Sequence, residues 1–193
     1  MKLEVECTWN EGKDKAKQQI YFNAKPKYIF SLPDETIFEI QRLEYALGKE
    51  GPVELEKLET LAKEHPKSLF TLISYYQALR FFELFDDAEP ELQKMKKNFP
   101  SQAFTKCCMA ESLLDAKKLD DFPATFDGME FLQRAFPKRR EFFFREALFF
   151  HNLWGRYHLE MGNEFKTGKH RNFIMLIMNT FNSSQIAAHS NAP

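Results

Sequence analysis

Apolar residues recur at intervals of three and four along most of the chain, which is the spacing of one face of an α-helix. The first such stretch starts after Pro33, a residue tolerated in a first helical turn, and we expect Gly48 to end the helix. Gly51 and Pro52 then open a second predicted helix, which ends before Pro66. Further helices are predicted over residues 68–84, 87–98, 101–116, 124–135, 139–161 and 167–181.

The two ends of the chain follow different patterns. Residues 3–9 alternate between polar and apolar side chains, and residues 19–22 favour a second β-strand, with turn-forming residues between them. We therefore expect a small β-hairpin or an extended arm over residues 1–30. Residues 182–193 are small and polar without periodicity, which predicts a flexible C-terminal tail. The remaining residues, 31–181, form the predicted helical domain, so the fold class is all-α.

Two prolines frame the most regular part of this domain. Pro66 and Pro100 lie 34 residues apart, and the small side chain of Ala88 lets one helix approach the other closely. This pattern resembles the tetratricopeptide repeat (TPR), a family of stacked antiparallel helical hairpins. The resemblance implies a TPR-like array with a right-handed superhelical twist over about residues 34–181. The positions that carry the resemblance are Leu72, Tyr75, Leu79, Ala88, Leu92, Met95 and Pro100.

The neighbouring units depart from the family pattern. Tyr76 occupies a position where the family has a small residue, and the next spacing, from Pro100 to Pro137, is 37 residues. Glu146 stands where a bulky apolar residue is typical. The sequence therefore favours a short irregular array of hairpins, and an unrelated helical bundle is the alternative.

Composition and charge limit the classes of partner. Of the 193 residues, 44% are apolar and 28% are charged, so the chain has enough apolar material to bury a core. The 21 phenylalanines exceed the needs of a small core, and we expect some of them to line seams between helices. A formal net charge of −1 provides no basic field, so no nucleic-acid partner is expected. The basic residues 138–140 are interpreted as a solvated helix start or loop.

Cysteine content and the N-terminal pattern favour the cytoplasm. The odd number of cysteines, with Cys107 and Cys108 adjacent, makes a poor disulfide framework. Residues 1–6 alternate between charged and apolar side chains, unlike a signal peptide. No uninterrupted apolar stretch approaches the roughly 18 residues of a membrane span.

The candidate chemistry is sparse. His151 and His158 share a helical face, but their spacing does not match the helical zinc motif, and polar surface or groove positions are expected for both. Cys107 and Cys108 have no histidine near them in sequence and are expected to be small buried hydrophobes. The sequence therefore predicts a protein without catalytic residues, metal ligands or cofactors.

The resemblance also implies a function. In TPR proteins the first helix of each hairpin lines a concave groove, and polar residues interleaved with aromatic ones suit a protein or peptide segment. We therefore expect a non-enzymatic protein–protein interaction module, although the same residues would also suit a solvated surface. The expected partner-binding residues are Gln77, Arg80, Phe81, Glu111, Asp115, Arg145, His151 and Asn152.

Two other functions are compatible with the sequence. An unrecognised all-α enzyme or accessory domain would gather His151, His158 and Glu164 in a deep pocket. A homo-oligomer would form through the aromatic-rich C-terminal helices, residues 141–181, if their apolar surface is exposed.

Overall fold

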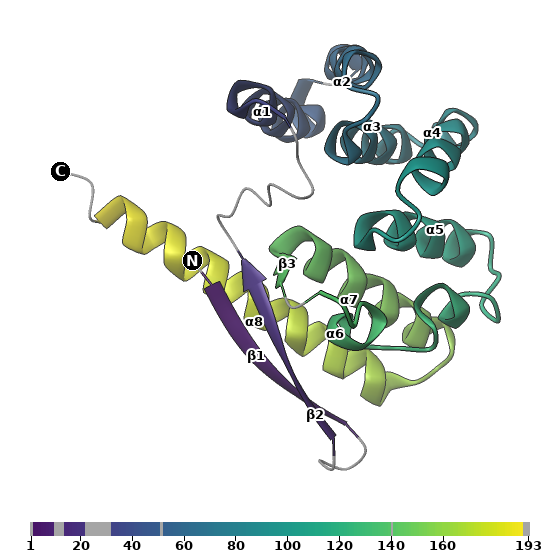
Figure 1. The fold of residues 1–193 in the computed structure, drawn as a ribbon, viewed down its shortest axis with the longest axis vertical. Helices are drawn as coiled ribbons and strands as arrows, with labels where there is room; N and C mark the ends of the chain where they lie inside the picture. Colours follow the sequence, from purple (N-terminus) through teal and green to yellow (C-terminus); the bar gives the residue numbers. More distant parts are fainter. Residues whose placement is uncertain (1, 10–13, 22–31, 51, 140, 191–193) are drawn as a thin grey trace. The chain divides into compact units, whose positions relative to one another are not determined.

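The computed structural model is mostly helical, which confirms the all-α class (Figure 1). The chain divides into two compact units. One is Lys25–Thr105, here called the α1–α4 unit, and the other is Met1–Ala24 together with Lys106–Pro193, here called the α5–α8 unit. No helix of the described residues is both long and apolar enough to cross a membrane. The structure describes residues 2–9, 14–21, 32–50, 52–139 and 141–190.

The α1–α4 unit is a succession of packed helices. Its helix α3 contacts both α2 and α4, while α1 contacts α2 and α3. Helix α3 is the centre of this unit, because apolar residues lie all around it and most of them are buried. The helices are α1 (Asp34–Glu50), α2 (Pro52–Glu64), α3 (Leu69–Phe81) and α4 (Phe85–Asn98).

Prolines and one left-handed residue set the helix boundaries in this unit. The prediction that Gly48 ends the first helix is wrong, because α1 continues to Glu50. The next helix begins at Pro52, a residue suited to the first turn of a helix. Between α3 and α4, Glu83 adopts a φ of 60°, and the Leu84 N–H donates to the Leu79 carbonyl at 2.9 Å.

The N-terminal residues of the α5–α8 unit form the predicted β-hairpin. Strands β1 (Lys2–Trp9) and β2 (Asp14–Tyr21) pair antiparallel, with Lys2 opposite Tyr21 and Trp9 opposite Asp14. The predicted turn covers residues 10–14. Residues 10–13 lie outside the described part, whereas Asp14 is the first residue of β2, which begins earlier than the predicted run at residue 19. A third strand, β3 (Glu141–Phe143), runs parallel to β2 and completes a small sheet in the order β1-β2-β3.

Two predicted helices of the α5–α8 unit are wrong in part. The predicted helix over 124–135 is interrupted at Asp127 and Gly128, which adopt φ values of 54° and 72° in the left-handed region. The predicted helix over 139–161 begins only at Phe144, since the residues before it pair with β2. The observed elements are α5 (Ala103–Asp115), η2 (Pro123–Phe126), α6 (Leu132–Ala135), α7 (Phe144–Glu160) and α8 (Glu164–Ser190).

Helix α8 is longer than the sequence pattern predicts. It begins at Glu164 rather than Thr167, because the Asn163 side chain accepts a hydrogen bond from the Lys166 N–H at 3.1 Å and caps the first turn. Its other end is at Ser190, so residues 182–190 of the predicted tail are helical. Helices α7 and α8 pack along each other (Figure 1).

Aromatic rings fill the core between η2 and α7. The ring of Phe126 makes edge contacts with Phe122 and Phe150, with centroids 5.9 and 4.9 Å apart. Trp154 packs edge-on against Phe122 at 5.0 Å, and Tyr157 stacks on Phe122 at 4.7 Å. These five residues are called the aromatic cluster below. They account for part of the high phenylalanine content.

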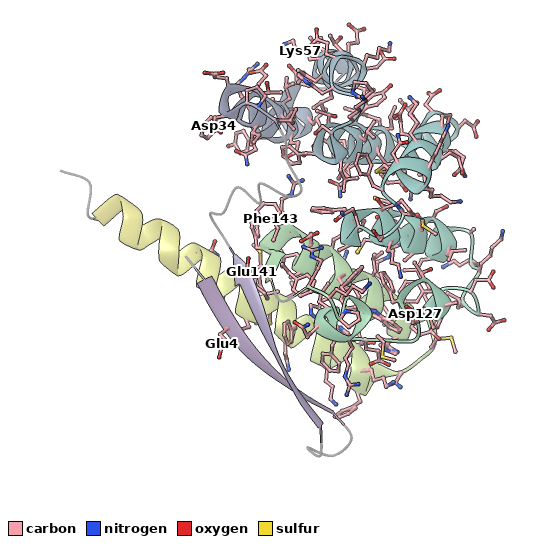
Figure 2. The ribbon with its side chains drawn as sticks, in the orientation of Figure 1. Glu4, Asp34, Lys57, Asp127, Glu141 and Phe143 are labelled. Carbon is pink, nitrogen blue, oxygen red and sulfur yellow. The ribbon has the colours of Figure 1, made fainter. Side chains whose placement is uncertain are left out.

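A buried ion pair holds the junction of β3 and α7. Figure 2 labels Glu141 and Phe143 at this junction. The guanidinium of Arg139 donates to both carboxylate oxygens of Glu146, at 2.9 and 2.8 Å, and the Phe143 N–H donates to the same carboxylate at 2.9 Å. The Glu146 side chain is only 1% exposed and that of Arg139 is 20% exposed. Arg139 is therefore not the solvated residue expected from the basic run.

Candidate functional site

The predicted partner-binding residues divide between the two units. Gln77, Arg80 and Phe81 lie on α3 of the α1–α4 unit. The other five lie on α5 and α7 of the α5–α8 unit, and each group is described within its own unit. The residues on these two helices are Glu111, Asp115, Arg145, His151 and Asn152.

An exposed aromatic patch occupies the end of α3 and the start of α4. Phe81 is 62% exposed, Phe85 is 52% exposed and Leu84 is 39% exposed. The guanidinium of Arg80 lies 4.8 Å from the Phe85 ring centroid and 5.9 Å from that of Tyr76. Arg80, Phe81, Leu84 and Phe85 are called the aromatic patch below. Two of its members, Arg80 and Phe81, are among the residues predicted from the sequence.

Two of the predicted acidic residues are bonded within their own unit. Arg156 of α7 donates to Asp115 at 2.7 Å and lies 3.8 Å from Glu111. Their carboxylates therefore connect α5 to α7. Arg145 is half-buried and Asn152 is exposed.

His151 does not line a surface groove. It is fully buried, with its ring 4.2 Å from that of Phe173 and 5.2 Å from that of His170, both on α8. The expectation of an accessible position is wrong because this side of α7 faces α8. His158 lies on the same side, is only 4% exposed, and is likewise not a surface residue.

His158 belongs to a buried cluster with His170 and Glu130, called the histidine–glutamate cluster below. Its ligand-type atoms all lie within 4.8 Å of one another. The Nε2 atom of His158 is 3.4 Å from Glu130 Oε2, and the Nε2 atom of His170 is 3.9 Å from the same oxygen. The other carboxylate oxygen, Oε1, accepts a hydrogen bond from Lys166 Nζ at 2.6 Å.

Neighbouring rings fix the two imidazoles of the cluster. The indole of Trp154 stacks on both, with interplanar angles of 28° to His158 and 12° to His170. On its far side, His170 Nδ1 lies 3.0 Å from His151 Nδ1, so one of these nitrogens donates to the other. The Nε2 atom of His158 is buried and has no hydrogen-bond partner among the described residues.

The electrostatics of the cluster favour an ionised carboxylate at Glu130 and a neutral imidazole at His170. Burial raises the pKa of Glu130, but the facing side chains of His158, His170 and Lys166 lower it by more, so it lies well below its usual range. Burial lowers the pKa of His170, and Glu130 offsets this only in part. Burial, together with His170, also holds the pKa of His151 well below its usual range.

Glu130 and His170 were not among the residues singled out from the sequence. Glu130 lies between η2 and α6, in a segment that was expected to be helical. Its closeness to His158 and His170 could therefore not be predicted from the sequence. His170 could have been found by pairing the last two predicted helices antiparallel about Gly162, which brings His158 and His170 to the same seam. Glu164, expected with the histidines in an enzyme pocket, is exposed.

The cysteines of α5 match their expectation. Cys107 and Cys108 are both fully buried. Burial raises the pKa of the Cys107 thiol well above its usual range, and the neighbouring Cys108 and the acidic Glu146 and Glu111 add to the shift. A thiol held in its neutral form is a poor nucleophile.

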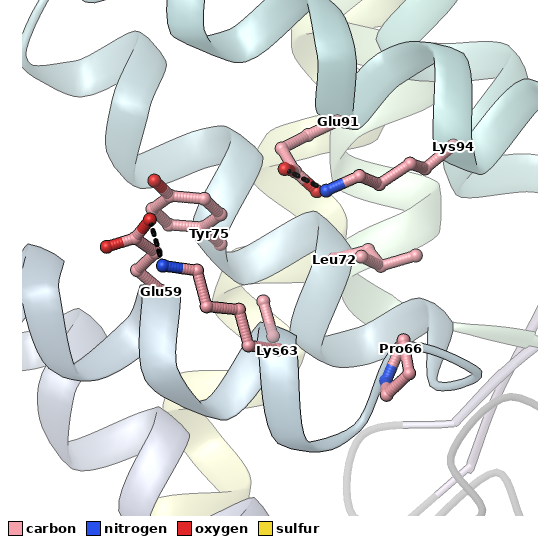
Figure 3. Close-up of a pocket in the computed structure, with 8 residues that line it drawn as sticks. Glu59, Lys63, Pro66, Leu72, Tyr75, Glu91 and Lys94 are labelled. Atoms are coloured by element: carbon pink, nitrogen blue, oxygen red, sulfur yellow. Dashed lines mark hydrogen bonds and ion pairs between the residues drawn. The ribbon is translucent and has the colours of Figure 1, made fainter.

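A small pocket lies among α2, α3 and α4 (Figure 3). Its volume of about 270 Å³ is just below the roughly 300–1,000 Å³ of drug-sized ligand sites. Two ion pairs, Glu59–Lys63 and Glu91–Lys94, each with a separation of 2.6 Å, lie on its walls. None of the predicted partner-binding residues lines it. The lining residues are Glu59, Ala62, Lys63, Pro66, Leu72, Tyr75, Glu91 and Lys94.

The Tyr75 hydroxyl in this pocket is expected to lose its proton at a higher pH than the hydroxyl of an unfolded tyrosine. Burial, followed by the nearby Glu59, Glu91 and Asp87, raises its pKa to about 12. An unfolded tyrosine ionises near pH 10, whereas the folded state keeps this proton to a higher pH. The free energy of unfolding should therefore fall as the pH rises from about 10 to 12. The chain has six tyrosines, so the titration of Tyr75 is obtained by subtracting the tyrosinate absorbance of Tyr75→Phe from that of the wild type. A difference curve centred near pH 10 would contradict the raised pKa of Tyr75.

Comparison with models of known protein families, with curated proteins and with solved structures gives no match.

Proposed function

We propose that the chain is a non-enzymatic protein-interaction module that binds a protein or peptide segment through the aromatic patch. The observation that carries the proposal is the exposure of Phe81 and Phe85 beside the Arg80 guanidinium. Aromatic residues and arginine are the side chains most enriched among residues that dominate binding energy at protein interfaces. The resemblance to the TPR family supports the same proposal, and the sequence features favour the cytoplasm as its location.

The charges around the patch define the chemistry of its partner. Glu83, Asp86 and Asp87 are all exposed and lie between or beside the residues of the patch. They outnumber the single cation, Arg80. A complementary segment therefore carries an apolar or aromatic anchor flanked by lysine or arginine, because opposite charges steer association and like charges oppose it.

A peptide-display selection followed by affinity measurement tests the proposal. Peptides selected on the wild-type chain are labelled, and their binding is measured by fluorescence anisotropy. The double variant Arg80→Ala/Phe81→Ala should weaken binding by about tenfold or more, since removing one interface anchor typically costs over 1–2 kcal/mol. The matched control is Arg42→Ala/Phe38→Ala on α1, where Phe38 is 64% exposed and the Arg42 side chain is 59% exposed.

The control separates patch recognition from general apolar or charge effects. Binding by the control variant should stay within about twofold of the wild type. Equal losses in the two double variants would contradict recognition by the patch, as would a selection that yields no enrichment of basic residues beside an apolar anchor.

A second candidate function, self-association, is favoured by exposed apolar residues on α7 and α8. Phe165 is 73% exposed, Leu159 is 62% exposed and Met175 is 55% exposed. If this surface pairs two copies of the chain, light scattering will show a mass that rises with concentration, and Met175→Glu will lower the dimer fraction. A constant monomer mass in the wild type at the highest soluble concentration would exclude it.

A further inference from the structure

The histidine–glutamate cluster has the composition of a transition-metal site. Two imidazoles and a carboxylate suit zinc and its neighbours in the first transition row, whereas magnesium and calcium prefer sites made of oxygen ligands alone. We propose that Glu130, His158 and His170 bind one divalent transition-metal ion, with Zn²⁺ as the representative ion.

The separations within the cluster are close to those that such an ion requires. Zinc binds imidazole nitrogen and carboxylate oxygen at about 2.0–2.2 Å, so neighbouring ligands of a tetrahedral site lie roughly 3.3–3.5 Å apart. The two distances from Glu130 Oε2, 3.4 Å to His158 Nε2 and 3.9 Å to His170 Nε2, need adjustments of only a few tenths of an ångström. All ligand atoms of the set lie within 4.8 Å of one another, so the most widely separated pair must also move closer when an ion binds.

The position of His158 Nε2 also favours a ligand. His158 is 4% exposed, and its Nε2 atom faces Glu130 Oε2 at 3.4 Å without making a well-oriented hydrogen bond to any described residue. A buried polar atom without a partner costs free energy, so such atoms are rare in folded proteins. An ion placed between Nε2 and the Glu130 carboxylate satisfies this atom.

The surroundings of the cluster match those of metal-binding histidines elsewhere. Such residues usually hydrogen-bond through the ring nitrogen that does not touch the metal, and this bond fixes the ring. His170 makes this contact through Nδ1 to His151 at 3.0 Å. With the proton on His170 Nδ1, its Nε2 atom presents a lone pair toward Glu130 Oε2. Trp154 stacks on both imidazoles and keeps them roughly parallel.

The site is incomplete on one side. Three protein ligands leave a fourth tetrahedral position, which water fills in zinc sites of this kind. Glu130 is 25% exposed and the Lys166 side chain is 42% exposed, so the ion reaches the cluster from their side. The Lys166 ammonium donates a hydrogen bond to Glu130 Oε1 and so competes with the metal ion for binding to this carboxylate.

Zinc titration of the tag-free full chain, stripped of metal with a chelator and dialysed, tests the proposal by isothermal titration calorimetry. The wild type should bind one Zn²⁺ per chain, and an equal titration with Mg²⁺ should give no heat of binding. Glu130→Gln, which keeps the size of the side chain, and His158→Ala should each weaken Zn²⁺ binding by about tenfold to a hundredfold or more, since even outer-shell partners have effects of this size. Lys166→Met should strengthen binding severalfold, because it removes the competing cation.

The control variant is His65→Ala, which removes an imidazole from the other unit and should leave the affinity within about twofold. Circular dichroism spectra confirm that each variant retains its helices. If a ligand variant fails to fold, nitrogen-15 spectra of histidine-labelled wild type replace it, and Zn²⁺ should then shift the Nε2 resonances of His158 and His170 and not those of His65. Absence of saturable Zn²⁺ binding, or undiminished binding by Glu130→Gln, would overturn the proposal and leave the cluster as a buried polar network.

Discussion

Replacing Phe126 by alanine should destabilise the α5–α8 unit by about 3–5 kcal/mol. Phe126 is fully buried, and its ring contacts those of Phe122, Phe150 and Trp154. Removing the ring loses its burial and leaves a cavity that the neighbouring rigid rings cannot fill. The loss is comparable to a large part of the roughly 5–15 kcal/mol that stabilises a typical domain.

Urea unfolding monitored by tryptophan fluorescence measures this effect in the correct unit. The chain has two tryptophans, Trp9 and Trp154, and neither is in the α1–α4 unit. In a Trp9→Phe background the signal comes from Trp154 alone, within the aromatic cluster. The control is Phe165→Ala, which removes a ring that is 73% exposed and should change stability by no more than about 0.5 kcal/mol. Similar losses for the two variants would contradict the packing described.

Replacing Arg139 by alanine should cost the same unit about 3–5 kcal/mol, for an electrostatic reason. The substitution leaves the carboxylate of Glu146, whose side chain is 1% exposed, without its bidentate partner. A buried charge without compensation is costly, whereas a buried pair as a whole often contributes little relative to apolar residues of the same size. The double variant Arg139→Met/Glu146→Leu should therefore lose less stability than Arg139→Ala alone.

The comparison of these two variants decides between two explanations of the ion pair. A double variant that is at least as unstable as Arg139→Ala would show that the hydrogen bond from the Phe143 N–H to Glu146 matters more than the charge. Lys138→Ala, at the exposed neighbour of Arg139, is the control and should have little effect.

The sequence predicts best those helices and strands whose own residues show the expected order of apolar and polar side chains. Helix α4 follows the apolar period closely, helix α3 is a run of mostly apolar residues, and the alternation in residues 3–9 correctly predicts β1. The helix predicted to end at residue 161 ends at Glu160, and Gly162 soon after it has a φ of 69°. These signals are local, because each depends on neighbouring residues only.

The errors arise where distant residues decide the local structure. Residues 141–143 are aromatic and charged and fit the period of the following helix, but pairing with β2 makes them a strand. Glu146 departs from the repeat pattern in the sequence, and its burial is explained by the ion pair with Arg139 and the hydrogen bond from the Phe143 N–H. The histidine–glutamate cluster likewise combines a loop residue with residues of two helices, so no motif of fixed spacing reveals it.

The pairing of β2 with β3 has a consequence for how the chain folds. Gln19 lies opposite Glu141, and the whole α1–α4 unit is encoded between them. During synthesis the first two strands leave the ribosome long before their partner, whereas the α1–α4 unit is one continuous stretch of the chain. We expect the α1–α4 unit to form first, and the small sheet to close late and slowly, because joining such distant residues carries a large loop-closure entropy.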